Sequence, residues 1–155
     1  MPETKNVFED MGQRDMTLLY RFRFWSISFL RIFLGIVFAY HGALRLFVPQ
    51  NLSGSIAYFT QVGIPYANFS VYLFGIIELV GGLLLFFGLL TRWAAFIAAL
   101  EMIYIFFNVH LKNGFLVSSN GYEFVLVIIA GLVVILASGA GRFALGNFFK
   151  SKHLK

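Results

Sequence analysis

Apolar runs long enough to cross a lipid bilayer dominate the sequence and restrict the chain to a helical membrane fold. A bilayer core of about 30 Å requires about 20 apolar residues in an α-helix. Four runs reach or approach that length, namely residues 24–47, 69–90, 93–111 and 122–137. Because 59% of the residues are hydrophobic and only 12% are charged, little of the chain is left for a soluble domain. We predict an all-α integral membrane protein, an antiparallel bundle of four transmembrane helices.

The basic residues lie near the ends of these runs, and their placement predicts the orientation of the chain. They precede the first run, separate the second from the third, and follow the fourth. By the positive-inside rule, both termini are cytoplasmic. This placement also explains an isoelectric point near 9.7 without a nucleic-acid-binding surface. We expect a cytoplasmic or interfacial tail over residues 1–23, a transmembrane domain over residues 24–146, and a basic cytoplasmic tail over residues 147–155.

The uncharged connection over residues 48–68 predicts a short helix on the outer face, between the first two crossings. Pro49 and Pro65 bracket this connection, and Ser53 is placed as an N-cap before the apolar residues 56–59. An apolar helix here would cover the open end of the bundle as a lid. A plain crossover at the membrane surface is the alternative.

Ionisable residues inside the apolar runs are the candidate functional groups. A charged side chain near the bilayer centre costs about 2.5–3.5 kcal/mol, so it should face the bundle interior and find a partner. At about 100° per residue, Arg31, His41 and Arg45 lie along one face of the first helix. The first helix therefore has one polar face, which we expect to point at its neighbours.

The second and third helices carry further buried polar groups. Glu78 shares a face with Gly75 and Gly82, and the two glycines allow a neighbouring helix to come close to the carboxylate. On a regular third helix, His110 would project about 180° away from Glu101. A frayed last turn is the alternative position for His110.

We predict two sets of ion pairs, because an unpaired charge at these depths is costly. Arg45 is expected to pair with Glu123, which begins the fourth helix. Arg31 is expected to form a structural pair with Glu101 or Glu78 that fixes the helix register. The groups in the outer half of the bundle mix acid, base and imidazole, and they predict a wet or ligand-filled pocket.

Short stretches in a fixed order resemble the DoxX family of small four-helix membrane proteins, over about residues 27–146. Two positions depart from the pattern. Arg45 stands where a lysine is usual, which keeps the charge but changes the hydrogen-bond geometry, and no acidic residue follows Arg142 closely. The resemblance implies a bacterial or archaeal inner-membrane protein, related to the DoxD-like subunit of thiosulfate:quinone oxidoreductase or acting in redox stress. The stretches are Leu30 to Gly35, Phe38 to Phe47, Glu78 to Gly82, Gly88 to Arg92, His110 to Phe115, Gly121 to Glu123, and Gly141 to Phe143.

A quinone-linked oxidoreductase subunit is the function we expect, with no catalytic residue assigned. Imidazole or guanidinium groups would bind the quinone carbonyls, and carboxylates would move protons. We expect no metal and no intrinsic cofactor, and because the chain has no cysteine, electrons would come from a soluble or membrane redox partner. Alternatives are a non-catalytic scaffold that recruits redox enzymes, a haem protein with His41 and His110 as ligands, and a small carrier. A homo-oligomer is compatible with each of these functions. The candidate ligand-binding or proton-handling residues are His41, Arg45, Glu78, His110, Tyr122 and Glu123.

Overall fold

The computed structural model describes the backbone of residues 3–147 and the side chains of Phe22 and of residues 25–147. A π-helical turn, Phe106–His110, continues the helix Thr91–Ile105. Two 3-10 turns follow, Leu111–Asn113 and Val117–Ser119. The described chain contains no strand, which confirms the all-α prediction. The main helices are α1 (Glu3–Phe47), α2 (Pro49–Gln61), α3 (Ala67–Phe87), α4 (Thr91–Ile105) and α5 (Glu123–Ser138).

Three helical segments are long and apolar enough to cross a membrane: Trp25–Phe47, Ala67–Phe87 and Thr91–Asn113. They correspond to the first three predicted runs. α5 is apolar but only 16 residues long, so a fourth crossing stays a prediction. Large apolar side chains such as Phe33 and Trp93 are exposed along these helices, which places the helices in contact with the lipid bilayer.

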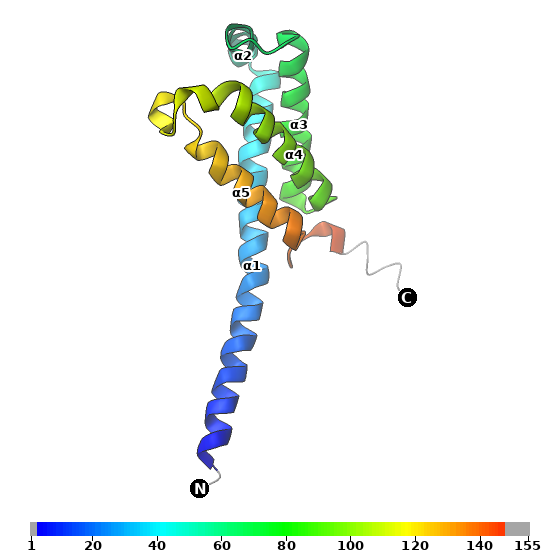
Figure 1. Ribbon diagram of the computed structural model, residues 1–155. Coiled ribbons are helices and arrows are strands. Elements are labelled where there is room, and N and C mark those ends of the chain that lie inside the picture. Colours follow the sequence, from blue (N-terminus) through cyan, green and yellow to red (C-terminus); the bar gives the residue numbers. More distant parts are fainter. Residues whose placement is uncertain (1–2, 148–155) are drawn as a thin grey trace.

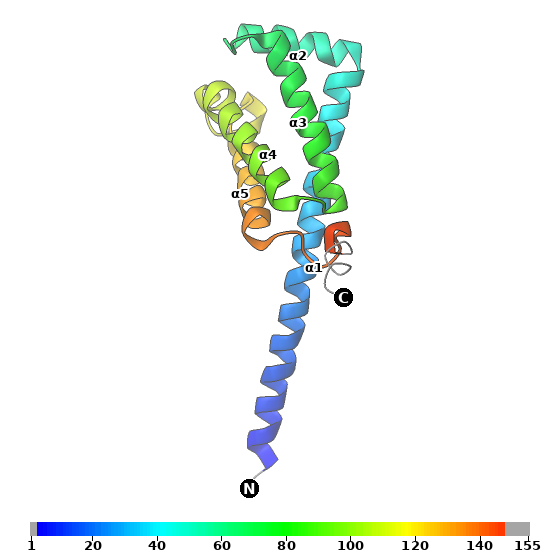
Figure 2. The ribbon, with the colours of Figure 1, turned by 90° about the vertical axis from the view of Figure 1, so that its right-hand side faces the viewer.

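The helices form two neighbouring pairs, α1 with α3 and α4 with α5 (Figures 1 and 2). α1 starts at Glu3 and continues without a break through the predicted N-terminal tail, so its first part extends beyond the other helices (Figure 1). The buried core lies between α3, α4 and α5, where Leu85 and Leu132 are fully buried against the small residues Ala95 and Ala98. The predicted C-terminal tail, beyond Asn147, lies outside the described residues.

α2 lies across the ends of α1 and α3, at what we call the α2 end of the bundle (Figure 2). The predicted N-cap at Ser53 is wrong. The helix already begins at Pro49, a residue that suits a first helical turn because it lacks a backbone N–H. The Ser53 hydroxyl lies inside the helix and donates to the Gln50 carbonyl at 3.1 Å. Whether α2 lies on the membrane surface stays a prediction.

Glycines bring the backbones of α1 and α3 into direct contact. A Cβ added to Gly35 would lie 2.9 Å from the Gly82 carbonyl oxygen, and one added to Gly42 would lie 2.8 Å from the Gly75 carbonyl oxygen. These obstacles are backbone atoms, which cannot rotate away. The structure therefore places Gly75 and Gly82 at the α1–α3 contact, opposite two glycines of α1 that the sequence pattern did not single out.

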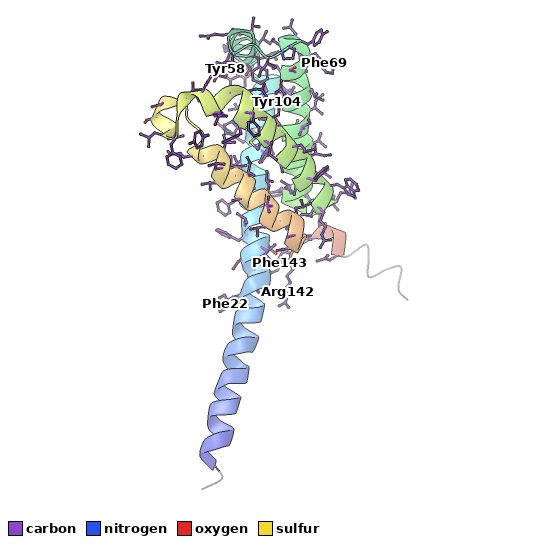
Figure 3. All side chains as sticks on the ribbon, in the orientation of Figure 1. Phe22, Tyr58, Phe69, Tyr104, Arg142 and Phe143 are labelled. Atoms are coloured by element: carbon purple, nitrogen blue, oxygen red, sulfur yellow. The ribbon has the colours of Figure 1, made fainter. Side chains whose placement is uncertain are left out.

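Arg31 binds backbone carbonyls at the end of the bundle away from α2, where Phe143 lies beside α1 (Figure 3). Its fully buried guanidinium donates to Phe86 at 2.8 Å and to Ala140 at 2.9 Å, and also to Leu85 and Phe143. The predicted ion pair of Arg31 with a glutamate is wrong: no carboxylate of the described residues contacts it. The guanidinium instead joins the last turn of α3, through Leu85 and Phe86, to the segment after α5, through Ala140 and Phe143.

We predict that Gly82→Leu strongly destabilises the protein, because its side chain would collide with the backbone of α1. Overpacking typically costs about 1–3 kcal/mol, and here the obstacle is rigid. The measurement is the midpoint of thermal unfolding in detergent, followed by size-exclusion chromatography. Gly81→Leu is the matched control, because Gly81 has open space around it, and it should behave like the unmodified protein. Equal losses in the two variants would contradict the close α1–α3 contact.

Candidate functional site

A cavity of about 250 Å³ lies at the α2 end, between the two helix pairs and beneath α2. Most of its wall is apolar, with Phe38, Phe59 and Ile128 among the buried lining residues. The polar groups come from four separate elements: α1, α2, α3 and the π-helical turn. They are His41, Arg45, Ser55, Tyr58, Glu78 and His110.

An ion pair between Arg45 of α1 and Glu78 of α3 forms one wall of the cavity. Arg45 Nη2 lies 3.1 Å from Glu78 Oε1. The guanidinium carbon also lies 5.5 Å from the centre of the Phe59 ring, in a cation–π contact. Gly75 lies beside the pair, and its missing side chain leaves room for Leu46, the residue that follows Arg45 on α1. The predicted pairing of Arg45 with Glu123 is therefore wrong.

Each partner of this ion pair keeps one buried polar atom without a hydrogen-bond partner among the described residues. These atoms are Arg45 Nη1, a donor, and Glu78 Oε2, an acceptor. A buried polar group without a partner costs free energy, so it is rare and calls for an explanation. A ligand that offers one acceptor and one donor would satisfy both atoms.

Glu101 of α4 is a second buried carboxyl group near this pair. It is 4% exposed, and neither of its oxygens has a hydrogen-bond partner in the described part of the chain. It interacts electrostatically with Glu78 and Arg45, and it does not form the structural ion pair predicted for it. Of the two carboxyl groups, Glu78 is the one that contacts the Arg45 guanidinium.

His110 reaches the cavity because the end of α4 is π-helical. Hydrogen bonds from i to i+5 widen the turn, so each residue rotates the chain by less than in a regular helix. His110 is therefore turned away from the position opposite Glu101 and lines the cavity. Its Nδ1 lies 2.7 Å from the Asn120 carbonyl oxygen, which only accepts. Nδ1 must then donate, and Nε2 of a neutral ring is left as an acceptor.

His41 and Tyr58 lie between the cavity and a second recess of about 330 Å³ under α2. His41 is exposed, and Tyr58 is fixed by a hydrogen bond of 2.7 Å that its hydroxyl accepts from Asn120 Nδ2. Figure 3 shows Tyr58 at the α2 end of the bundle. Tyr58 and Ser55 were absent from the predicted site, although both lie in the segment that was predicted to form a lid.

Glu123 and Tyr122 lie outside the cavity, where the connection between α4 and α5 ends and α5 begins at Glu123. Glu123 Oε1 accepts a hydrogen bond of 2.9 Å from the Val117 backbone N–H, which closes this connection. The Tyr122 ring packs edge-on against Phe106 and Phe115. Of the six predicted ligand residues, the structure therefore brings four together, and it leaves these two in a structural position. The described residues contain no group of three potential metal ligands.

Comparisons with known proteins identify one family and several relatives of this chain. The DoxX family profile matches residues 26–111. An uncharacterized protein of Haemophilus influenzae is 37% identical over 87% of this chain and 99% of its own length. A Bacillus subtilis protein named "Putative oxidoreductase CatD" is 35% identical over 79% of this chain and 87% of its own length. An uncharacterized membrane protein of Mycobacterium tuberculosis is 31% identical over 77% of this chain and 78% of its own length. No solved structure matches significantly.

We predict strong thermodynamic coupling between Arg45 and Glu78. Arg45→Met and Glu78→Gln should each destabilise the protein by about 3–5 kcal/mol, because each leaves the other group buried without its partner. The double variant should lose much less than the sum of the two. The measurement is unfolding in detergent for both single variants and the double variant. A parallel cycle of Arg45→Met with Glu123→Gln should be additive, and the reverse pattern would contradict the observed pair.

Proposed function

Because this chain belongs to the DoxX family, we propose that it is a membrane subunit of an oxidoreductase and that its cavity binds a quinone headgroup. The carrying observation is the pair of unpartnered buried atoms, Arg45 Nη1 and Glu78 Oε2. A quinone offers carbonyl oxygens that accept hydrogen bonds, and the quinol offers hydroxyl groups that donate them. The same site thus has a partner for both oxidation states.

The other cavity residues suit the same ligand. Phe38, Phe59 and Ile128 supply an apolar surface for the quinone ring. Glu78 and His110 are groups that can accept or release a proton at the ring oxygens when the quinone is reduced or the quinol is oxidised. The chain has no cysteine, so we place the electron donor on a redox partner protein. The name of the Bacillus subtilis relative, which includes "oxidoreductase", supports this class.

We further propose a bacterial or archaeal inner-membrane location with both termini in the cytoplasm. The described chain begins and ends on the side away from α2 (Figure 1), as the charge distribution predicts. The cavity then lies in the outer half of the membrane and α2 lies at the outer surface. In this orientation α5 completes an antiparallel bundle as the fourth crossing.

A scaffold that recruits redox enzymes is the second candidate function. The observation that favours it is the extension of α1, which carries a helix from Glu3 well beyond the rest of the bundle (Figures 1 and 2). Such an extension offers a partner a surface outside the membrane. A scaffold has no need of the cavity, so the two functions differ in whether the isolated protein binds quinone.

We predict that purified protein in detergent binds ubiquinone or menaquinone, and that the double variant Arg45→Met, Glu78→Gln binds at least about tenfold more weakly. Loss of one net hydrogen bond accounts for about a tenfold change. Binding is measured by equilibrium dialysis at fixed detergent concentration. Glu123→Gln is the control and should keep the affinity of the unmodified protein. Equal affinity in a folded double variant would exclude this site, and absence of binding in the unmodified protein would favour the scaffold.

A further inference from the structure

The cavity is large enough for a headgroup only. Its volume of about 250 Å³ is below the range of roughly 300–1,000 Å³ that is typical of pockets enclosing a drug-sized ligand. On the proposed function, a lipid-soluble quinone that contacts Arg45 and Glu78 must leave its hydrocarbon tail outside. The route of the tail depends on which walls of the cavity open.

The recess under α2 is one route, and its lining is polar. It shares His41, Arg45 and Tyr58 with the cavity and adds Gln50 and Asn51. A hydrocarbon tail here would cover these polar groups without offering them hydrogen bonds, which is unfavourable. The recess therefore suits water or a proton path better than a tail.

The second route lies between α1 and α5. These helices touch at Gly131, where an added Cβ would lie 3.0 Å from the Leu34 side chain. α5 crosses α1 at a steep angle, so the two helices separate from this point toward the α2 end (Figures 1 and 2). Within the gap, the cavity is lined by Val37 of α1 and by Phe124 and Ile128 of α5.

This gap opens on a lipid-facing side of the molecule. Phe124 lines the cavity and is nevertheless 51% exposed, so the cavity continues to the surface beside it. Phe33, one turn before Val37 on α1, and Val127, one turn after Phe124 on α5, are apolar and exposed. An apolar opening bordered by apolar exposed side chains matches a hydrocarbon tail.

We propose that the gap between Val37 and Phe124 is a side opening to the bilayer that holds the isoprenoid tail of a quinone, while its headgroup contacts Arg45 and Glu78. The ligand class is then a quinone with an isoprenoid chain, which enters from the hydrocarbon layer. A water-soluble quinone without a tail would use the headgroup contacts alone.

The test compares two quinones with the same headgroup, one without a tail and one with two isoprene units. In the unmodified protein the tail should tighten binding at least about tenfold, because it buries several apolar carbons in the gap. Val37→Trp should fill the gap and reduce this gain to less than about threefold. Ile36→Trp is the matched control, an adjacent and exposed position outside the cavity lining, and it should keep the full gain. Partition of each quinone into detergent is measured without protein, and affinities are calculated from the corrected free concentration.

The outcomes separate this proposal from the proposed function. If both quinones bind the unmodified protein equally well, the side opening is wrong and the headgroup site stands. If neither binds, the proposed function fails, and the opening fails with it. If the tail tightens binding to the Ile36→Trp variant as little as it does to the Val37→Trp variant, the proposal of a side opening is also wrong.

Photolabelling of the unmodified protein gives a second test that needs no variant. A quinone with a photoreactive group on its first isoprene unit should label peptides of α1 and α5 around Val37 and Phe124. The tail-free quinone, added in excess, should suppress this labelling. Labelling of α2 at Gln50 and Asn51 instead would place the tail in the recess and overturn the proposal.

Discussion

The direct backbone contact between α1 and α3 is the constraint on which the rest of the structure depends. Ordinary helix pairs keep their axes about 8–10 Å apart, with side chains between them. At the contact of Gly35 and Gly42 with α3, backbone atoms themselves meet. This approach lets Arg45 reach Glu78 over a short distance, and it holds the ion pair in one position at the edge of the cavity. The charged wall of the cavity is thus a consequence of residues without side chains.

The two intramembrane arginines of α1 show how surroundings decide the role of one residue type. Arg31 directs its donors at backbone carbonyls of α3 and of the segment after α5, and it is fully buried. Arg45, four turns of helix further on, has one carboxylate partner and keeps Nη1 without a partner among the described groups. The first arginine joins chain segments, whereas the second retains a donor that a ligand can use.

Helical periodicity predicted the directions of the charged side chains of α1 and α3 but not their partners. It placed Arg31 and Arg45 on one face of α1 and Glu78 with its two glycines on one face of α3, and the structure has both faces at the helix contact. It could not reveal that Arg31 binds carbonyls, because backbone acceptors leave no trace in the residue pattern. Periodicity also did not predict that Tyr58 lines the cavity. The position of α2 over the cavity depends on tertiary packing and on the hydrogen bond of Tyr58 with Asn120.

The π-helical turn at Phe106–His110 makes the orientation of His110 depend on the number of residues before it. A wide turn accommodates one more residue than a regular turn does. In a relative with one residue fewer in this stretch, the helix would regain its ordinary winding, and an equivalent histidine would face another side. Among related proteins, the length of this short stretch therefore carries as much information about the cavity as the presence of the imidazole.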